Sequence, residues 1–315
     1  MDPVSKIIIP FFALIFFGYA AARKNWVPPA AVPAFNGFLL YFAVPALLFR
    51  FASAAAFAEI MNGRFFIAYA LAGLVTLFLV IAFARGVMGA RLRDASFYGL
   101  AASATNIGYL AIPLLVALLG ESAASPAMIA TVSEMTIVAS VAVAVSQLDG
   151  TQSTGWRQAV RDAIARAAVN PFLISIVAGA AFSALRWQLP TPINEIMNLL
   201  ANAAGPCALF AIGVSLYRPG ATQGVPLIAL PVAGKLFLHP FIVWLALLAF
   251  GLDRFTVTVG VLTAALPTAG WVFIFAQRYE SDVARISTAL VASTALAAIT
   301  FSGLVWYLGL GMATK

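Results

Sequence analysis

The sequence predicts an all-α polytopic membrane protein with ten transmembrane helices. Of its 315 residues, 63% are hydrophobic and only 9% are charged, whereas about a quarter of the residues in a soluble domain are charged. The apolar runs are long and continuous rather than alternating, which favours helices over a membrane barrel. So few charges could not cover a globule in water, and the composition therefore excludes a soluble enzyme, a nucleic-acid-binding protein and a disordered regulator.

Ten apolar runs account for most of the chain, and each is close to the roughly 20 residues that one span needs. They lie at about 6–22, 33–52, 64–85, 96–119, 125–147, 169–186, 193–217, 225–250, 255–277 and 284–310. The first run has no basic region followed by a small-residue cleavage site, so we expect a retained span. The most polar interior stretch separates two halves of five runs. We therefore expect an N-terminal repeat at 1–148, a cytoplasmic linker at 149–168 and a C-terminal repeat at 169–315.

The basic residues predict the orientation of these spans. Seventeen of the eighteen Lys and Arg residues lie between the runs, and only Lys235 lies inside one. Loops on the side of the two termini hold six of them, and loops on the opposite side hold eleven. The positive-inside rule then places the linker in the cytoplasm and both termini outside it. We interpret the net charge of +7 as this topology signal rather than as a surface for nucleic acid.

Short matches between the halves predict an internal duplication. The segment PALLF that begins at Pro45 recurs as PCALF at Pro206, an offset of 161. Asp94 precedes the fourth run as Asp253 precedes the ninth, an offset of 159. Because each half has an odd number of spans, the second copy must be inverted in the membrane. Inverted repeats are common in secondary transporters, which bind substrate near the midplane where the copies meet.

Helix-breaking residues interrupt the fourth and ninth runs at matching places, since Gly108 falls opposite Pro267 under the 159 offset. A break frees backbone groups that lipid cannot satisfy, so it must face protein, water or a ligand. Half-helix N-termini meeting there would favour an anion such as a carboxylate. Ordinary proline kinks are the alternative. The predicted substrate site comprises the breakers and their polar neighbours: Asn106, Gly108, Pro113, Pro267, Thr268 and Gly270.

Three ionisable residues inside the runs are candidate coupling groups, because charges at membrane depth are costly and usually pair or titrate. Glu134, in the middle of the fifth run, is interpreted as a proton or cation coupling group or as the structural partner of a buried base or hydroxyl. Lys235 either balances Glu134, attracts an anionic substrate or extends its ammonium to the membrane surface. His239 shares a helix face with Lys235 and is a packing residue or a proton relay.

Polar and proline residues in the second and seventh runs are candidates for lining the pathway: Asn36, Pro45, Asn202 and Pro206. Hydrogen bonding between helices is the alternative for the two asparagines. The single cysteine, Cys207, excludes an internal disulfide framework, and the single histidine excludes a multi-histidine metal site. We therefore expect no cofactor, apart from a coupling proton or sodium ion.

These motifs resemble those of the auxin efflux carrier family, which includes plant auxin carriers and bacterial carriers related to malonate transporters. The segment FAVP at 42–45 is similar to the corresponding segment of the plant carriers. Asn106-x-Gly108 with Pro113 resembles the family's first crossover, and LPTAG at 266–270 resembles the ninth span of the bacterial branch. The resemblance covers essentially the whole chain.

The resemblance implies a scaffold built from spans 1, 2, 6 and 7 and a moving transport domain built from spans 3–5 and 8–10. Spans 4 and 9 would cross as broken helices, the motion would be of the elevator type, and a homodimer would form through the scaffold helices. The bacterial branch implies an inner-membrane location. The third run, 64–85, has no acidic residue, so the coupling carboxylate expected there in some plant members is absent.

We expect a secondary active transporter of a small organic anion, such as malonate, malate or an auxin-like acid, and not an enzyme. The chain has no phosphate-binding Gly-rich loop, and one His with one Cys disfavours an intramembrane enzyme. The alternative is a cation/proton antiporter on a related inverted-repeat fold. Such an antiporter is expected to place carboxylates at the crossover, where this sequence has the uncharged Asn106 and Thr268.

Overall fold

The computed structural model describes residues 3–54, 62–106, 110–149, 171–217 and 225–308. Within these ranges every regular element is a helix, apart from one isolated β-bridge between Thr105 and Thr268. The predicted all-helical class is therefore confirmed for this part of the chain. The expected cytoplasmic linker lies outside the described residues, except for Asp149.

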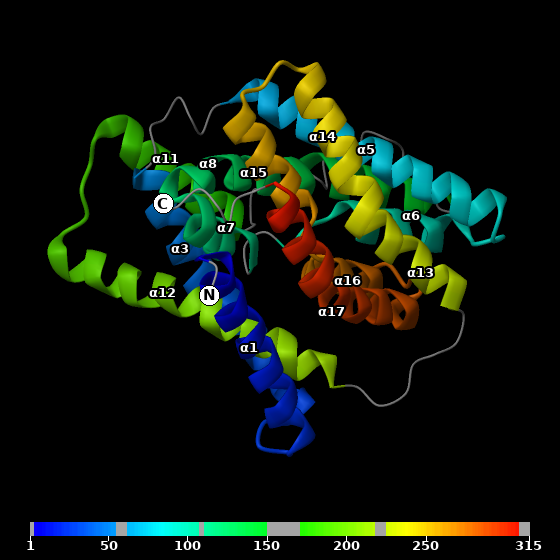
Figure 1. Ribbon diagram of the computed structural model, residues 1–315, viewed down its shortest axis with the longest axis horizontal. Helices are drawn as coiled ribbons and strands as arrows, with labels where there is room; N and C mark the ends of the chain where they lie inside the picture. Colours follow the sequence, from blue (N-terminus) through cyan, green and yellow to red (C-terminus); the bar gives the residue numbers. More distant parts are fainter. Residues whose placement is uncertain (1–2, 55–61, 107–109, 150–170, 218–224, 309–315) are drawn as a thin grey trace.

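The helices follow one another closely along the chain (Figure 1). In order they are α1 (Pro3–Arg23), α2 (Val32–Phe38), α3 (Val44–Ala54), α5 (Gly63–Gly86), α6 (Leu92–Ser103), α7 (Ile112–Leu119), α8 (Ala124–Ser133), α9 (Ala139–Ser146), α11 (Pro171–Leu185), α12 (Thr191–Leu216), α13 (Val225–Ala233), α14 (His239–Ala249), α15 (Arg254–Ala264), α16 (Gly270–Arg278) and α17 (Val283–Tyr307). Short 3-10 turns precede α2 and α8 and follow α9.

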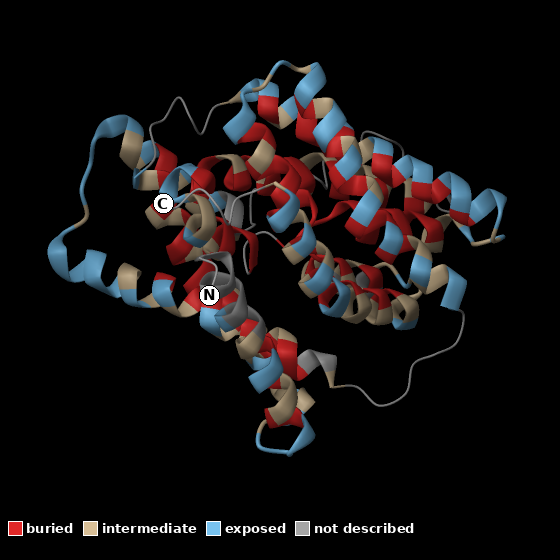
Figure 2. Ribbon diagram, viewed as in Figure 1, coloured by how far each residue is buried: buried red, intermediate tan, exposed pale blue. Residues whose placement is uncertain are grey.

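Within the described residues, six helical stretches are long and apolar enough to cross a membrane: Pro29–Ala54, Gly63–Gly86, Glu121–Ser146, Thr191–Val214, Val225–Ala249 and Val283–Tyr307. Their outer faces are apolar as well. On α5 the exposed side chains include Ile67, Leu71, Val75 and Phe78, which recur every three or four residues and so form one stripe. Water would not favour such a stripe, whereas lipid does. Figure 2 shows this outward face of α5 and the buried residues gathered toward the centre of the molecule.

Three helix starts carry polar N-caps that satisfy an otherwise free backbone N–H. The side chain of Asn62 accepts a hydrogen bond from Phe65 N at 3.1 Å before α5. Asp253 caps α15 and Asp282 caps α17 in the same way. These caps explain why the predicted runs and the observed helices begin at nearly the same residues.

Three π-turns lie wholly within the described residues, and the hydrophobic pattern did not predict them: η2 (Leu39–Ala43), η5 (Glu134–Val138) and η7 (Gly234–Leu238). Pro45 and Pro240 each follow the end of a π-turn by two residues. A proline has no N–H and clashes with the carbonyl four residues earlier, and a wider turn at that point relieves both problems. The third, η5, has no such proline after it.

The helices pack in two groups. In the first, α12 contacts α1 and α3, and α3 contacts α11; these four lie toward the left and lower side of Figure 1. Gly18 and Gly213 allow α1 and α12 to touch, because a Cβ at Gly213 would lie 2.0 Å from the Ile15 carbonyl oxygen. In the second group, α5 packs on α6 and α14, α6 on α9, and α13 on α17. Helices α7 and α8 link the groups through α1 and α3.

Two of the predicted spans are interrupted helices. Helix α6 ends at Ser103 and α7 begins at Ile112, while α15 ends at Ala264 and α16 begins at Gly270. Under the offset of 159, residues 104–111 correspond to 263–270, so the two interruptions occupy equivalent places in the two halves. Of the breakers in the first interruption, Gly108 lies outside the described residues.

Candidate functional site

The two interruptions meet and satisfy each other's backbone groups. Asn106 N donates to the Pro267 carbonyl at 3.0 Å, and Ala269 N donates to the Ala104 carbonyl at 3.1 Å. These bonds form the antiparallel bridge between Thr105 and Thr268, and both threonines are buried. Backbone groups that lipid could not hydrogen-bond are therefore paired inside the protein. We call this pairing the bridge.

New helical hydrogen bonding starts on both sides of the bridge. Leu110 N and Ala111 N donate to the Asn106 carbonyl at 3.2 and 3.1 Å, and Val272 N donates to the Ala269 carbonyl at 3.2 Å. The helices that follow, α7 and α16, therefore begin close to the bridge, with their partially positive ends toward it. Asn106 is only 6% exposed, and its side-chain amide has no hydrogen-bond partner within the described part of the chain.

Glu134 brings a carboxylate to the bridge. It lies in the π-turn η5 and is buried; its Oε2 accepts a hydrogen bond from Thr105 N at 2.8 Å. Its Oε1 lies 3.4 Å from the Tyr69 hydroxyl, which donates to it from α5. The crossover residues Asn106 and Thr268 are themselves uncharged, but the bridge receives a carboxylate from another span. The fifth span supplies one from 29 residues further along the chain.

Lys235 reaches the same residue from the other side. It lies in the π-turn η7 and is fully buried, and its Nζ donates to Thr105 Oγ1 at 2.5 Å. This burial excludes the alternative in which the ammonium extends to the membrane surface. Among the described residues Lys235 forms no direct ion pair with Glu134; instead Thr105 connects the two charges through its N–H and its hydroxyl.

His239 lies one helical turn after Lys235 and is fully buried beside Tyr69, with the two ring centroids 5.9 Å apart. Its Nδ1 is 3.2 Å from Thr76 Oγ1, and the Thr76 hydroxyl donates its proton to the Ala72 carbonyl. Thr76 must then accept from His239, which places a proton on Nδ1, and full burial favours the neutral ring. Nε2 is a buried acceptor without a partner in the described structure.

Thr268 has a structural role at the bridge. Its hydroxyl donates to the Ala101 carbonyl at 2.8 Å, and its N–H donates to Ser293 Oγ of α17 at 3.2 Å. The hydroxyl proton is thus already used, which leaves Thr268 only lone pairs to offer a ligand. Sequence reasoning missed Thr105, Tyr69 and Ser293, because no motif marks an isolated hydroxyl in an apolar helix.

The remaining predicted residues lie away from the bridge or at its edge. Pro113 packs toward α12, since a Cβ at Gly205 would lie 3.4 Å from Pro113 Cβ. Gly270 is half-buried at the start of α16. Asn202 is exposed and accepts a hydrogen bond from Arg50 Nη1 at 2.8 Å. This bond joins α12 to α3, in agreement with the alternative in which the asparagine hydrogen-bonds between helices. Three others lie outside the bridge contacts, with Asn36 and Pro45 half-buried and Pro206 exposed.

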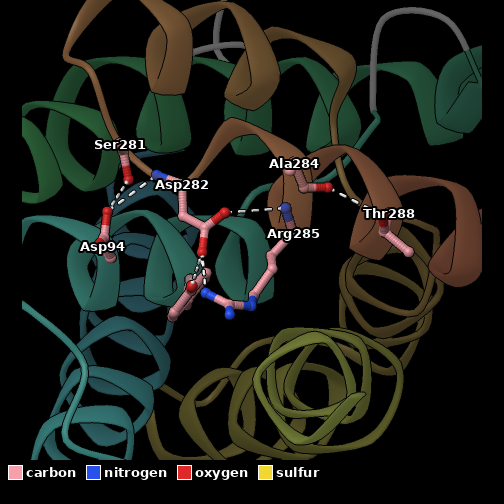
Figure 3. Close-up of polar contacts among 7 residues, drawn as sticks. Asp94, Ser281, Asp282, Ala284, Arg285 and Thr288 are labelled. Atoms are coloured by element: carbon pink, nitrogen blue, oxygen red, sulfur yellow. Dashed lines mark hydrogen bonds and ion pairs between the residues drawn. The ribbon is translucent and has the colours of Figure 1, made fainter. Parts of the chain in front are cut away.

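A second polar cluster joins the start of α6 to the start of α17 (Figure 3). Asp94 accepts hydrogen bonds from Ser281 Oγ at 3.1 Å and Asp282 N at 3.0 Å. Asp282 in turn accepts from the Tyr98 hydroxyl at 2.7 Å and pairs with the Arg285 guanidinium. Burial opposes ionisation of Asp282, but these donors outweigh it and hold the pKa of the carboxyl below its ordinary value.

Similarity to known proteins agrees with this architecture. The model of a family described as "Membrane transport protein" matches residues 3–153 and 151–307. The chain is 33% identical over 314 residues to a "Putative malonate transporter" of Rhizobium meliloti (strain 1021), an alignment that covers 99% of this chain and 98% of the relative. The chain belongs to the auxin efflux carrier family.

Two further relatives show the breadth of this family. "Uncharacterized transporter YfdV" of Escherichia coli (strain K12) is 24% identical over 275 residues, which is 87% of each chain. "Auxin efflux carrier component 7" of Arabidopsis thaliana is 29% identical over 164 residues, 50% of this chain and 25% of that carrier. This auxin efflux carrier family member is therefore a multi-pass membrane transport protein. No group of three or more metal-ligating side chains occurs among the residues that the structure describes.

Proposed function

We propose that the protein is a secondary active transporter of a small organic anion, which binds where the two interrupted helices meet. The observation that carries this proposal is the bridge between Thr105 and Thr268, beside which α7 and α16 begin. Helix N-termini favour carboxylates, and the Asn106 amide, which has no hydrogen-bond partner among the described residues, adds a donor at the same place. Lys235, also at the bridge, supplies a positive charge.

The substrate we propose is a small carboxylate. The name of the Rhizobium meliloti relative supports malonate, and the plant relatives support an auxin-like acid. Malate belongs to the same chemical class as malonate. The site offers amide, ammonium and helix-end donors, all of which complement a carboxylate.

We further propose alternating access by an elevator-type movement. The scaffold would comprise the group of α1, α2–α3, α11 and α12, and the transport domain the remaining helices, so that ten spans form two inverted repeats. Two features support this division: the helices pack mainly within these groups, and the interruptions occupy equivalent places in the two halves. A homodimer through the scaffold, a bacterial inner membrane and termini outside the cytoplasm complete the proposal.

Uptake into proteoliposomes tests the function. Purified protein is assayed with radiolabelled malonate, malate and indole-acetate under imposed proton or sodium gradients. We expect at least one acid to accumulate, and Asn106→Ala to lower its uptake by about tenfold or more through loss of a donor to a charged group. The matched control is Asn194→Ala, which removes an exposed asparagine at the start of α12. Equal uptake by the Asn106 variant and this control would reject the site.

One observation favours a cation/proton antiporter as a second candidate. Glu134 places a buried carboxylate against the bridge, as an antiporter needs. The same proteoliposomes decide between the two functions. Sodium–proton exchange without movement of any organic acid would establish the antiporter, and accumulation of an acid would dismiss it.

A further inference from the structure

Among the described residues, the Lys235 ammonium uses only part of its hydrogen-bonding capacity at the bridge. It is fully buried, and one of its three N–H groups donates to Thr105 Oγ1. The other two have no protein acceptor among the described residues. A buried charge whose donors lack acceptors in the described structure is costly, so Lys235 is suited to a further anionic partner that is not part of the protein.

Glu134 is the protein carboxylate that competes with a substrate anion for the positive charge of Lys235. Four groups face it from the elements packed around η5: Tyr69 of α5, Thr105 after α6, Lys235 of η7 and, behind Tyr69, the neutral His239 of α14. Lys235 is the only one of these four that carries a positive charge. While Glu134 is ionised, the two side-chain charges at the bridge therefore cancel.

The helix ends do not change this balance. Two N-terminal ends, of α7 and α16, and two C-terminal ends, of α6 and α15, lie next to the bridge. Each end carries about half a charge, positive at N-termini and negative at C-termini, so the four nearly cancel in sum. The side chains of Glu134 and Lys235 therefore decide the net charge that a substrate meets.

We propose that Lys235 binds the second carboxylate of a short dicarboxylate substrate, and that Glu134 takes up a proton so that its negative charge no longer cancels the charge of Lys235. This inference rests on the proposed function, in which the first carboxylate lies at Asn106 and the adjoining helix N-termini. Thr105 and Asn106 are consecutive, with Cα atoms about 3.8 Å apart. Because Lys235 is held at Thr105 and Asn106 is the next residue, a short dicarboxylate is the class of anion that we propose reaches both donors.

The two oxygens of Glu134 are not equivalent as proton acceptors. Oε2 accepts from the Thr105 backbone N–H, which can act only as a donor. Oε1 faces the Tyr69 hydroxyl, which can rotate and become an acceptor. The proton therefore binds to Oε1, and the resulting O–H group donates a hydrogen bond to the Tyr69 oxygen. The hydrogen bond from Thr105 N to Oε2 is kept. One proton enters with each dianion and leaves Oε1 when the substrate is released on the other side.

Malonate and malonamate test this inference. Malonamate has nearly the same shape but bears an amide in place of one carboxylate, so it carries one negative charge. Uptake of both is measured for the wild-type protein, Lys235→Arg, Glu134→Gln and the double variant Glu134→Gln/Lys235→Met. The double variant removes both charges together and so leaves no unpaired buried charge, which keeps the fold testable.

Relative to Glu134→Gln, the double variant is expected to lose malonate uptake by about tenfold or more while malonamate uptake changes less than about twofold. Lys235→Arg is expected to retain the preference for malonate. In the wild-type protein we expect malonate uptake to rise as the external pH falls. Part of this pH dependence comes from the titration of malonate itself, which is the same for every variant. Glu134→Gln should keep only that part.

Equal loss of malonate and malonamate uptake in the double variant would overturn the role of Lys235. A pH dependence in Glu134→Gln equal to that of the wild type would overturn the role of Glu134. Both results differ from failure of the proposed function, in which the wild-type protein would transport neither acid. Comparable thermal unfolding of the four proteins confirms that the variants are folded.

Discussion

Thr105 and Glu134 are joined by a 2.8 Å hydrogen bond from the backbone N–H of one to the carboxylate of the other. The N–H is free because α6 has ended two residues earlier, at Ser103. A broken helix and a buried acid in a neighbouring span thus satisfy each other. This relationship connects the backbone of the proposed substrate site to the residue that we propose binds the coupling proton.

Thr105→Val should lower the free energy of unfolding by about 1–3 kcal/mol. The change removes the acceptor of the buried Lys235 ammonium but leaves the backbone N–H that donates to Glu134. Thr105→Ser keeps a hydroxyl and should lie close to the wild type. Thermal unfolding in detergent measures both. Identical melting of the valine and serine variants would show that the hydroxyl contributes nothing.

Gly213→Ala should destabilise the contact between α1 and α12, because the added methyl would lie 2.0 Å from the Ile15 carbonyl oxygen. Overpacking of this kind costs about 1–3 kcal/mol. Gly303→Ala in α17 is the matched control, since nothing lies within 4 Å of a Cβ there. We expect a lower melting temperature only for the first variant, and an equal effect of both would refute close helix contact.

The Asp282 carboxyl should make stability depend on pH in the acidic range. Its pKa is lowered in the folded protein, so its contribution is complete above the unfolded value of about 4 and is lost as the pH falls through the lower folded value. Asp282→Asn keeps a side-chain oxygen to cap α17 but has no charge. The melting temperatures of the two proteins should therefore differ at neutral pH and converge in acid. A constant difference across this range would contradict the assignment.

A reporter fused after Lys315 should lie outside the cytoplasm, and one inserted within 149–168 should lie inside it. The physical reason is the excess of Lys and Arg in loops on the linker side. Paired fusions of alkaline phosphatase and green fluorescent protein measure this directly, since each is active on only one side. Fluorescence of green fluorescent protein fused after Lys315, without phosphatase activity there, would show that the orientation is the reverse of the predicted one.

Sequence reasoning succeeded where the determining interactions are local. Composition and continuous apolar runs predicted an all-helical membrane protein, and the runs agree with the observed helices, as 284–310 does with α17 (Val283–Tyr307). Pro267 and the glycine opposite it marked interruptions that the helices do show. Pro45 and Pro240, which follow η2 and η7, indicate two π-turns that hydrophobicity alone does not predict.

By itself, the sequence determined the solvent, the helices and the places where they break, because apolar runs, proline and glycine act on their own few residues. Only the tertiary structure decided what meets at the breaks. Glu134 and Lys235 lie 29 and 130 residues from Thr105, and their approach depends on the packing of α5, α6, η5 and η7. A charge inside an apolar run indicates that a partner must exist, but the partner is selected by how helices pack in space.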